Sequence, residues 1–90
     1  MTEEKKIIME ATLNALDALG IPAKNPKDVS TGLKNAWQAY TPLSTKEFLN
    51  IAKNASAGKY GIPFKFVSAI IGSWVYEERK LQAEKKRGQL

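Results

Sequence analysis

The chain has 90 residues, a net charge of +5 at neutral pH, and neither cysteine nor histidine. A chain of this length forms one domain at most and buries about 60–65% of its unfolded surface, so its core is small. The missing residue types exclude a disulfide framework, a thiol nucleophile and the commonest general base and metal ligand. We therefore expect no enzyme and no cofactor.

The positive charge is distributed unevenly. Residues 1–20 carry two lysines against four acids, whereas residues 21–90 carry twelve basic residues against five acids. No apolar run approaches the roughly 20 residues that a bilayer helix needs, and the first six residues are too acidic to open a secretory signal. These features predict a soluble, cytoplasmic protein without a membrane partner, and the basic body suits nucleic acid or another acidic partner.

The first predicted helix runs from Glu3 to Leu19, with acids in its first turn and Gly20 at its end. Apolar side chains fill most of its circumference, which is wider than a single buried stripe. Such a helix is either central in its own domain or packs against a second copy, so a homodimer is one of two alternatives.

The next two helices have clear start signals. Asn25 and Pro26 suit the cap and first position of a helix that ends before Thr41-Pro42. Ser44 and Glu47 form a capping box, which predicts the start of a third helix. Leu43 can pack against Phe48 across that start, as a hydrophobic staple.

The turn at residues 59–63 leads to the longest helix, for which Pro63 is well placed at the first position. This helix buries one broad face, and its apolar pattern lapses beyond Leu81. We expect residues from Gln82 onward to fray or remain disordered. The sequence therefore predicts an all-α fold: a compact four-helix domain, residues 1–84, with a long C-terminal helix and a basic tail, residues 85–90.

Three bulky residues recur every fourth position in this last helix: Phe66, Ile70 and Trp74. On a helix they lie along one stripe. That stripe is either ordinary core or the support for a surface on which nucleic-acid bases stack beside cations.

Residues 48–55, with sequence FLNIAKNA, and residues 64–74, with sequence FKFVSAIIGSW, carry a resemblance to a known family. They resemble the C-terminal domain of DnaD-type replication-initiation proteins, which includes phage replisome organisers. The shared pattern is an alanine-bearing helix, a loop and an aromatic-xxx-Ile-xxx-Trp helix. The resemblance covers about half of the chain, and Phe66 stands where the family usually has tyrosine.

The resemblance implies a helical domain that assists loading of the replicative helicase and binds DNA through this motif and the helix or tail after it. A phage or plasmid replication accessory fits best. Residues Phe66, Ile70 and Trp74 would form the motif, and the basic follow-on would comprise Arg79, Lys80, Lys85, Lys86 and Arg87.

A structural role for Ile70 and Trp74 is the alternative, because large apolar residues on a helix face are usually buried. Tyr60, in a turn between two glycines, then becomes the better stacking residue. Phosphate contacts would come from cations near the join of the third and fourth helices: Lys53, Lys59, Lys65, Arg79 and Lys80. The cations at 85–87 also suit the end of a solvated helix.

Two functions remain open. The first is a DNA-binding replication accessory that contacts the phosphate backbone without sequence specificity and prefers single strands because bases stack on its aromatic residues. The second is a small helical protein-interaction module, such as a phage or plasmid adaptor or inhibitor of a replication protein, that uses the apolar surface of the first helix.

Overall fold

A computed structural model describes residues 3–88, and this part of the chain contains helices and no strand. The predicted all-α fold with a long C-terminal helix is confirmed. The helices are α1 (Glu3–Ala18), α2 (Pro26–Ala39), α3 (Thr45–Ser56) and α4 (Val67–Gly88).

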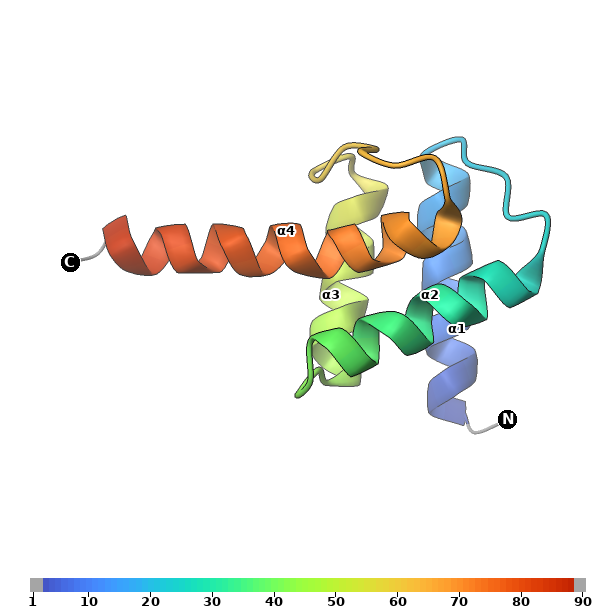
Figure 1. Cartoon of the computed structure of the whole chain (residues 1–90), viewed down its shortest axis with the longest axis horizontal. Helices are drawn as coiled ribbons and strands as arrows, with labels where there is room; N and C mark the ends of the chain where they lie inside the picture. Colours follow the sequence, from blue (N-terminus) through green and yellow to red (C-terminus); the bar gives the residue numbers. More distant parts are fainter. Residues whose placement is uncertain (1–2, 89–90) are drawn as a thin grey trace.

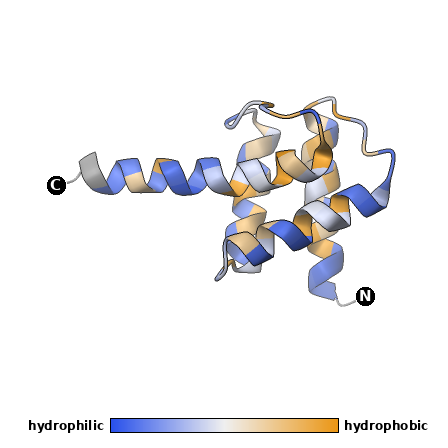
Figure 2. Ribbon diagram, in the orientation of Figure 1, coloured by the Kyte–Doolittle hydropathy of each residue, from blue (hydrophilic) through white to orange (hydrophobic). Residues whose placement is uncertain are grey.

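The four helices form two crossed layers. Helix α1 packs mainly against α3, and α2 packs mainly against α4 (Figure 1). The second half of α4 extends away from the body, so the molecule measures 44 × 27 × 19 Å. Figure 2 shows that this extension is mostly hydrophilic, whereas the hydrophobic residues gather where the helices cross.

The core lies between the two layers. Its largest fully buried side chains include Trp74 of α4, Phe48 and Ile51 of α3, and Leu16 of α1. Helix α1 therefore packs against other helices of its own domain, as the first of the two alternatives for its wide apolar surface predicted. Part of its apolar surface is left open, because Ile7 and Leu13 of α1 remain exposed, and a homodimer stays a prediction.

A glycine sets the distance between α2 and α4. A Cβ atom added to Gly32 would lie 2.9 Å from the Cα atom of Ser68 and 2.9 Å from Cδ1 of Ile71. Real Cβ atoms essentially never approach a backbone carbon so closely. The absence of a side chain at Gly32 therefore allows α4 to lie directly on α2, and this contact fixes the position of the α4 surface discussed below.

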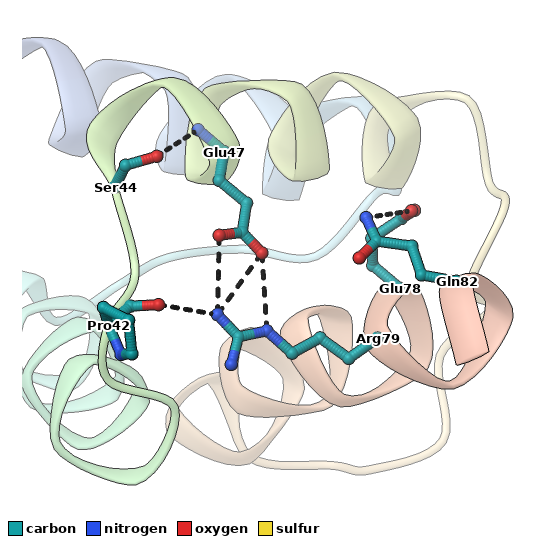
Figure 3. A network of polar contacts seen from close by, with 6 residues as sticks. All are labelled: Pro42, Ser44, Glu47, Glu78, Arg79 and Gln82. Carbon is teal, nitrogen blue, oxygen red and sulfur yellow. Dashed lines mark hydrogen bonds and ion pairs between the residues drawn. The ribbon is translucent and has the colours of Figure 1, made fainter. Parts of the chain in front are cut away.

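The predicted N-cap of α2 is confirmed, and so is one of the two hydrogen bonds of the predicted capping box at the start of α3. The Asn25 side chain accepts a hydrogen bond from the Lys27 amide at 3.0 Å, and the Ser44 hydroxyl accepts one from the Glu47 amide at 3.0 Å. The second bond of a capping box would join the Glu47 side chain to the Ser44 amide. Here the Glu47 carboxylate faces Arg79 of α4 instead (Figure 3). Leu43 and Phe48 both belong to the buried core, as a staple requires.

The predicted start of α4 at Pro63 is wrong, since the helix begins at Val67. The Tyr60 hydroxyl donates a hydrogen bond to Glu78, which lies eleven residues after the start of α4. Residues 61–66 are not helical, and they connect Tyr60 to the start of α4.

The C-terminal prediction is corrected in part. Helix α4 continues through Gln82 to Gly88, so the residues expected to fray are helical, and the expected boundary at residue 85 falls inside the helix. Their side chains at positions 82–86 are exposed, as the lapsed apolar pattern indicated. Residues 89–90 of the predicted tail lie outside the described residues.

Candidate nucleic-acid interface

Tyr60 does not stack ligands from the surface, because the turn that carries it folds inward. Gly58 and Gly61 both adopt left-handed backbone angles, with φ of 79° and 71°. Glycine tolerates this conformation without strain. The reversal places Tyr60 among the core residues with 9% of its surface exposed. The prediction that Tyr60 is an exposed stacking residue is therefore wrong.

The Tyr60 hydroxyl instead donates a 2.6 Å hydrogen bond to Oε1 of Glu78. Glu78 also accepts bonds from Asn54 of α3 at 3.4 Å and from Gln82 at 3.2 Å. The Tyr60 bond is the main cause that lowers the pKa of Glu78, against the opposing effect of burial, and Lys59 contributes in the same direction as the bond. Burial, followed by the bond to Glu78, raises the pKa of Tyr60 above its ordinary value. This buried network attaches the turn to α3 and α4.

Arg79 is also engaged within the fold. Its guanidinium donates to the Pro42 carbonyl at 2.9 Å and forms an ion pair with Glu47 at 3.3 Å (Figure 3). Its charge also lies 5.9 Å from the centre of the Tyr40 ring, within the range of a cation–π interaction. The guanidinium joins the α2–α3 loop to α4, so the prediction that Arg79 contacts phosphate conflicts with its partners.

The aromatic-xxx-Ile-xxx-Trp stripe is divided between core and surface. Ile70 and Trp74 are buried, with 1% and 0% of their surfaces exposed, which confirms the structural alternative for these two residues. Phe66 precedes the first turn of α4 and is 76% exposed. Phe66 is thus the one member of the stripe that a ligand can reach.

Two further aromatic side chains are exposed close to the start of α4 or on its outer face. Phe64 is 51% exposed and Tyr76 is 53% exposed. Both line a groove of about 390 Å³ between α4 and the C-terminal half of α2. Among the described residues, the exposed aromatic side chains are Phe64, Phe66 and Tyr76, and we call these three the aromatic surface below.

Two lysines lie close to members of the aromatic surface in the chain. Lys65 stands between the two phenylalanines and is exposed. Lys80 follows Tyr76 by four residues, which places it on the same face of α4, and it is also exposed. Two of the predicted cations, Lys65 and Lys80, are therefore exposed and close in the chain to members of the aromatic surface.

The other predicted cations are farther apart in the fold. Lys53 is exposed on α3, and Lys59 is exposed in the turn near Glu78. Lys85 and Lys86 are exposed on the projecting part of α4, while the side chain of Arg87 lies outside the described residues. These cations belong to three separate elements, and the expected clustering of cations at the join of α3 and α4 stays a prediction.

The sequence analysis did not identify Phe64 or Tyr76 as surface residues. Tyr76 could have been found, since two residues after Trp74 a helix has turned by about 200° and faces away from the core. Phe64 could not, because the predicted start at Pro63 placed it inside a helix that in fact begins three residues after Phe64.

No metal site is evident in the described part of the chain, where no group of three or more acidic side chains could hold an ion. None of the described helices is both long enough and apolar enough to span a bilayer. Scans against protein-family models, curated proteins and solved structures find no match to the chain. The resemblance to DnaD-type domains therefore stays a prediction from the sequence motif.

Proposed function

We propose that this protein is a non-enzymatic accessory of DNA replication that binds single-stranded DNA without sequence specificity. Bases stack on the aromatic surface, and Lys65 and Lys80 pair with phosphates on either side of it. The replication role rests on the resemblance to DnaD-type domains, and a replicative helicase or another replication protein is the expected protein partner.

The observation that carries the binding proposal is the exposure of Phe66, at 76%, directly beside Lys65. Exposing a whole phenyl ring to water is unfavourable, and aromatic side chains beside cations are the usual platform for single strands. Duplex DNA keeps its bases stacked on one another, so it cannot use such a platform. A preference for single strands follows.

The test measures affinity by fluorescence anisotropy with single-stranded and duplex DNA at two salt concentrations. Changing Phe66 to alanine should weaken single-strand binding by about 5- to 150-fold, the range for loss of one stacked base. Changing Lys65 and Lys80 together to glutamate should weaken it further. It should also reduce the slope of log affinity against log salt by about 1.4, since each phosphate contact contributes about 0.7.

A charge-matched control distinguishes a local site from general attraction. Lys6 and Lys46 are exposed near the starts of α1 and α3, at the end of the body away from the α3–α4 loop (Figure 1). Changing both to glutamate alters the net charge by the same amount. Equal losses in the two double variants, or no binding to single strands at low salt, would contradict the proposal.

A protein-interaction module is the second candidate. Ile62, two residues before Phe64 in the chain, is 52% exposed. Exposed apolar side chains that lie together mark protein interfaces. The apolar surface of α1, where Ile7 and Leu13 are exposed, is the other expected docking surface. Absence of DNA binding at low salt, together with capture of a replication protein that Phe66→Ala abolishes, would favour this function.

A further inference from the structure

The groove between α2 and α4 has features that the proposed stacking surface does not explain. Its volume of about 390 Å³ falls at the lower end of ordinary ligand sites. Phe64 contributes a wall from the non-helical segment before α4, and Tyr76 contributes one from α4 itself. Tyr40, at the end of α2, lines the same groove. A flat aromatic ligand is the shape that such walls accept.

Apart from Ser73 and the tyrosines, two polar side chains line this groove, and they come from different helices. Glu77 belongs to α4 and Asn35 to α2. Neither forms a hydrogen bond or an ion pair with another residue in the described range 3–88. Glu77 is unpaired although basic residues follow it closely along α4, at positions 79 and 80. Its carboxylate oxygens are therefore available as hydrogen-bond acceptors beside aromatic walls.

A free carboxylate disfavours phosphate, so it would recognise the edge of a base and not the backbone. A carboxylate accepts two parallel hydrogen bonds when two donors lie side by side. Guanine offers this arrangement on its pairing edge through N1–H and the N2 amino group. Thymine offers one N–H between two carbonyl oxygens, which repel a carboxylate. Guanine is thus the base whose donors match Glu77 best.

We propose that the groove binds one unstacked guanine of the strand, with Phe64 and Tyr76 against its faces and Glu77 on its pairing edge. This inference rests on the proposed function, because the strand brings the base to the groove. It adds a preference for one base to an otherwise sequence-independent contact. Asn35, on the opposite helix, can donate its amide to the guanine O6 atom.

The test uses thymidine oligonucleotides of about 12 residues, a length within the range that single-strand sites cover. One central position is dT, dA, dC or dG, so that a single guanine is presented without quadruplex formation. The oligonucleotide with dG should bind the unaltered protein about 5- to 10-fold more tightly than the one with dT, the lower end of the effect of a bidentate base contact. Glu77→Gln should abolish this difference while binding to dT persists.

Glu84→Gln is the matched control, because it removes the same charge from an exposed position on α4 that does not line the groove. It should keep the preference for dG. Equal affinity for all four oligonucleotides would overturn this inference and leave the proposed function intact, and so would a preference that survives in Glu77→Gln. Absence of binding to every oligonucleotide at low salt would instead overturn the proposed function.

Discussion

The inner and outer faces of α4 differ in almost every property. The inner face carries Ile70, Ile71, Trp74 and Val75, each at most 1% exposed. The outer face and its approach carry the aromatic surface, of which each member is more than half exposed. One helix therefore holds the fold together on one side and offers a binding surface on the other. Substitutions on the two faces should accordingly affect stability and binding separately.

The largest expected effect is the loss of stability in Trp74→Ala. Removing this fully buried indole leaves a cavity where the two layers meet, and such changes cost about 3–5 kcal/mol. Phe66→Ala, the same kind of truncation on the outer face, should change stability by less than about 0.5 kcal/mol. Urea denaturation followed by circular dichroism measures both. Similar losses in the two variants would contradict the division between the faces.

The second prediction concerns the contact of α4 with α2. Gly32→Ala should cost about 2–3 kcal/mol, the upper part of the range for overpacking, because the new Cβ meets the backbone of Ser68. Gly72→Ala is the control, since nothing lies within 4 Å of its added Cβ. It should stabilise α4 by about 0.5–1 kcal/mol. Urea midpoints that shift in the same direction for both variants would show that this contact is not tight.

Tyr60→Phe tests whether the buried turn is separate from the binding surface. Loss of its bond to the Glu78 carboxylate should cost about 1–2 kcal/mol at neutral pH. Affinity for single-stranded DNA should not change. A loss of affinity without a loss of stability would contradict the assignment of Tyr60 to the core.

The same variant should also alter the dependence of stability on pH. The pKa of Glu78 is lowered in the folded protein, chiefly by the Tyr60 bond. Its contribution is therefore present above the unfolded-state pKa and is lost as the pH falls through the lower, folded-state value. Unfolding free energies of Tyr60→Phe should fall less between neutral and acid pH than those of the unaltered protein. Parallel pH profiles would exclude this role of the bond.

Local sequence signals predicted the parts of this fold that depend on neighbours in the chain. Asn25 and Ser44 mark helix starts because a cap bonds to amides two or three residues away. The four-residue spacing of Ile70 and Trp74 likewise identified the buried face of α4. These signals act within one or two helical turns.

The position of Tyr60 and the start of α4 were not predictable in this way. Tyr60 contacts Glu78, eighteen residues further along the chain, and the non-helical residues 61–66 precede Val67. The groove between α2 and α4 depends on how these helices cross at Gly32. Only the packed structure brings Phe64 and Tyr76 to one site.

The smallest expected effect is the loss of stability in Arg79→Lys, a change that tests whether Arg79 acts differently from Lys80. Its ion pair with Glu47 is about one-third exposed on both sides, and such pairs contribute at most about 1 kcal/mol. Arg79→Lys keeps the charge but loses the forked geometry that joins Glu47 to the Pro42 carbonyl. It should therefore destabilise the fold by about 0.5–1 kcal/mol, whereas Lys80→Arg should not.

Affinity for single-stranded DNA decides the role of the guanidinium. If Arg79 serves only the α2–α3 loop, Arg79→Lys binds as tightly as the unaltered protein, and the stability difference shrinks near 1 M salt, where charges are screened within about 3 Å. A loss of affinity comparable to that of Lys80→Glu would instead place Arg79 in the phosphate contact. In that case the ion pair with Glu47 must open when DNA binds, and the two faces of α4 would be coupled through this side chain.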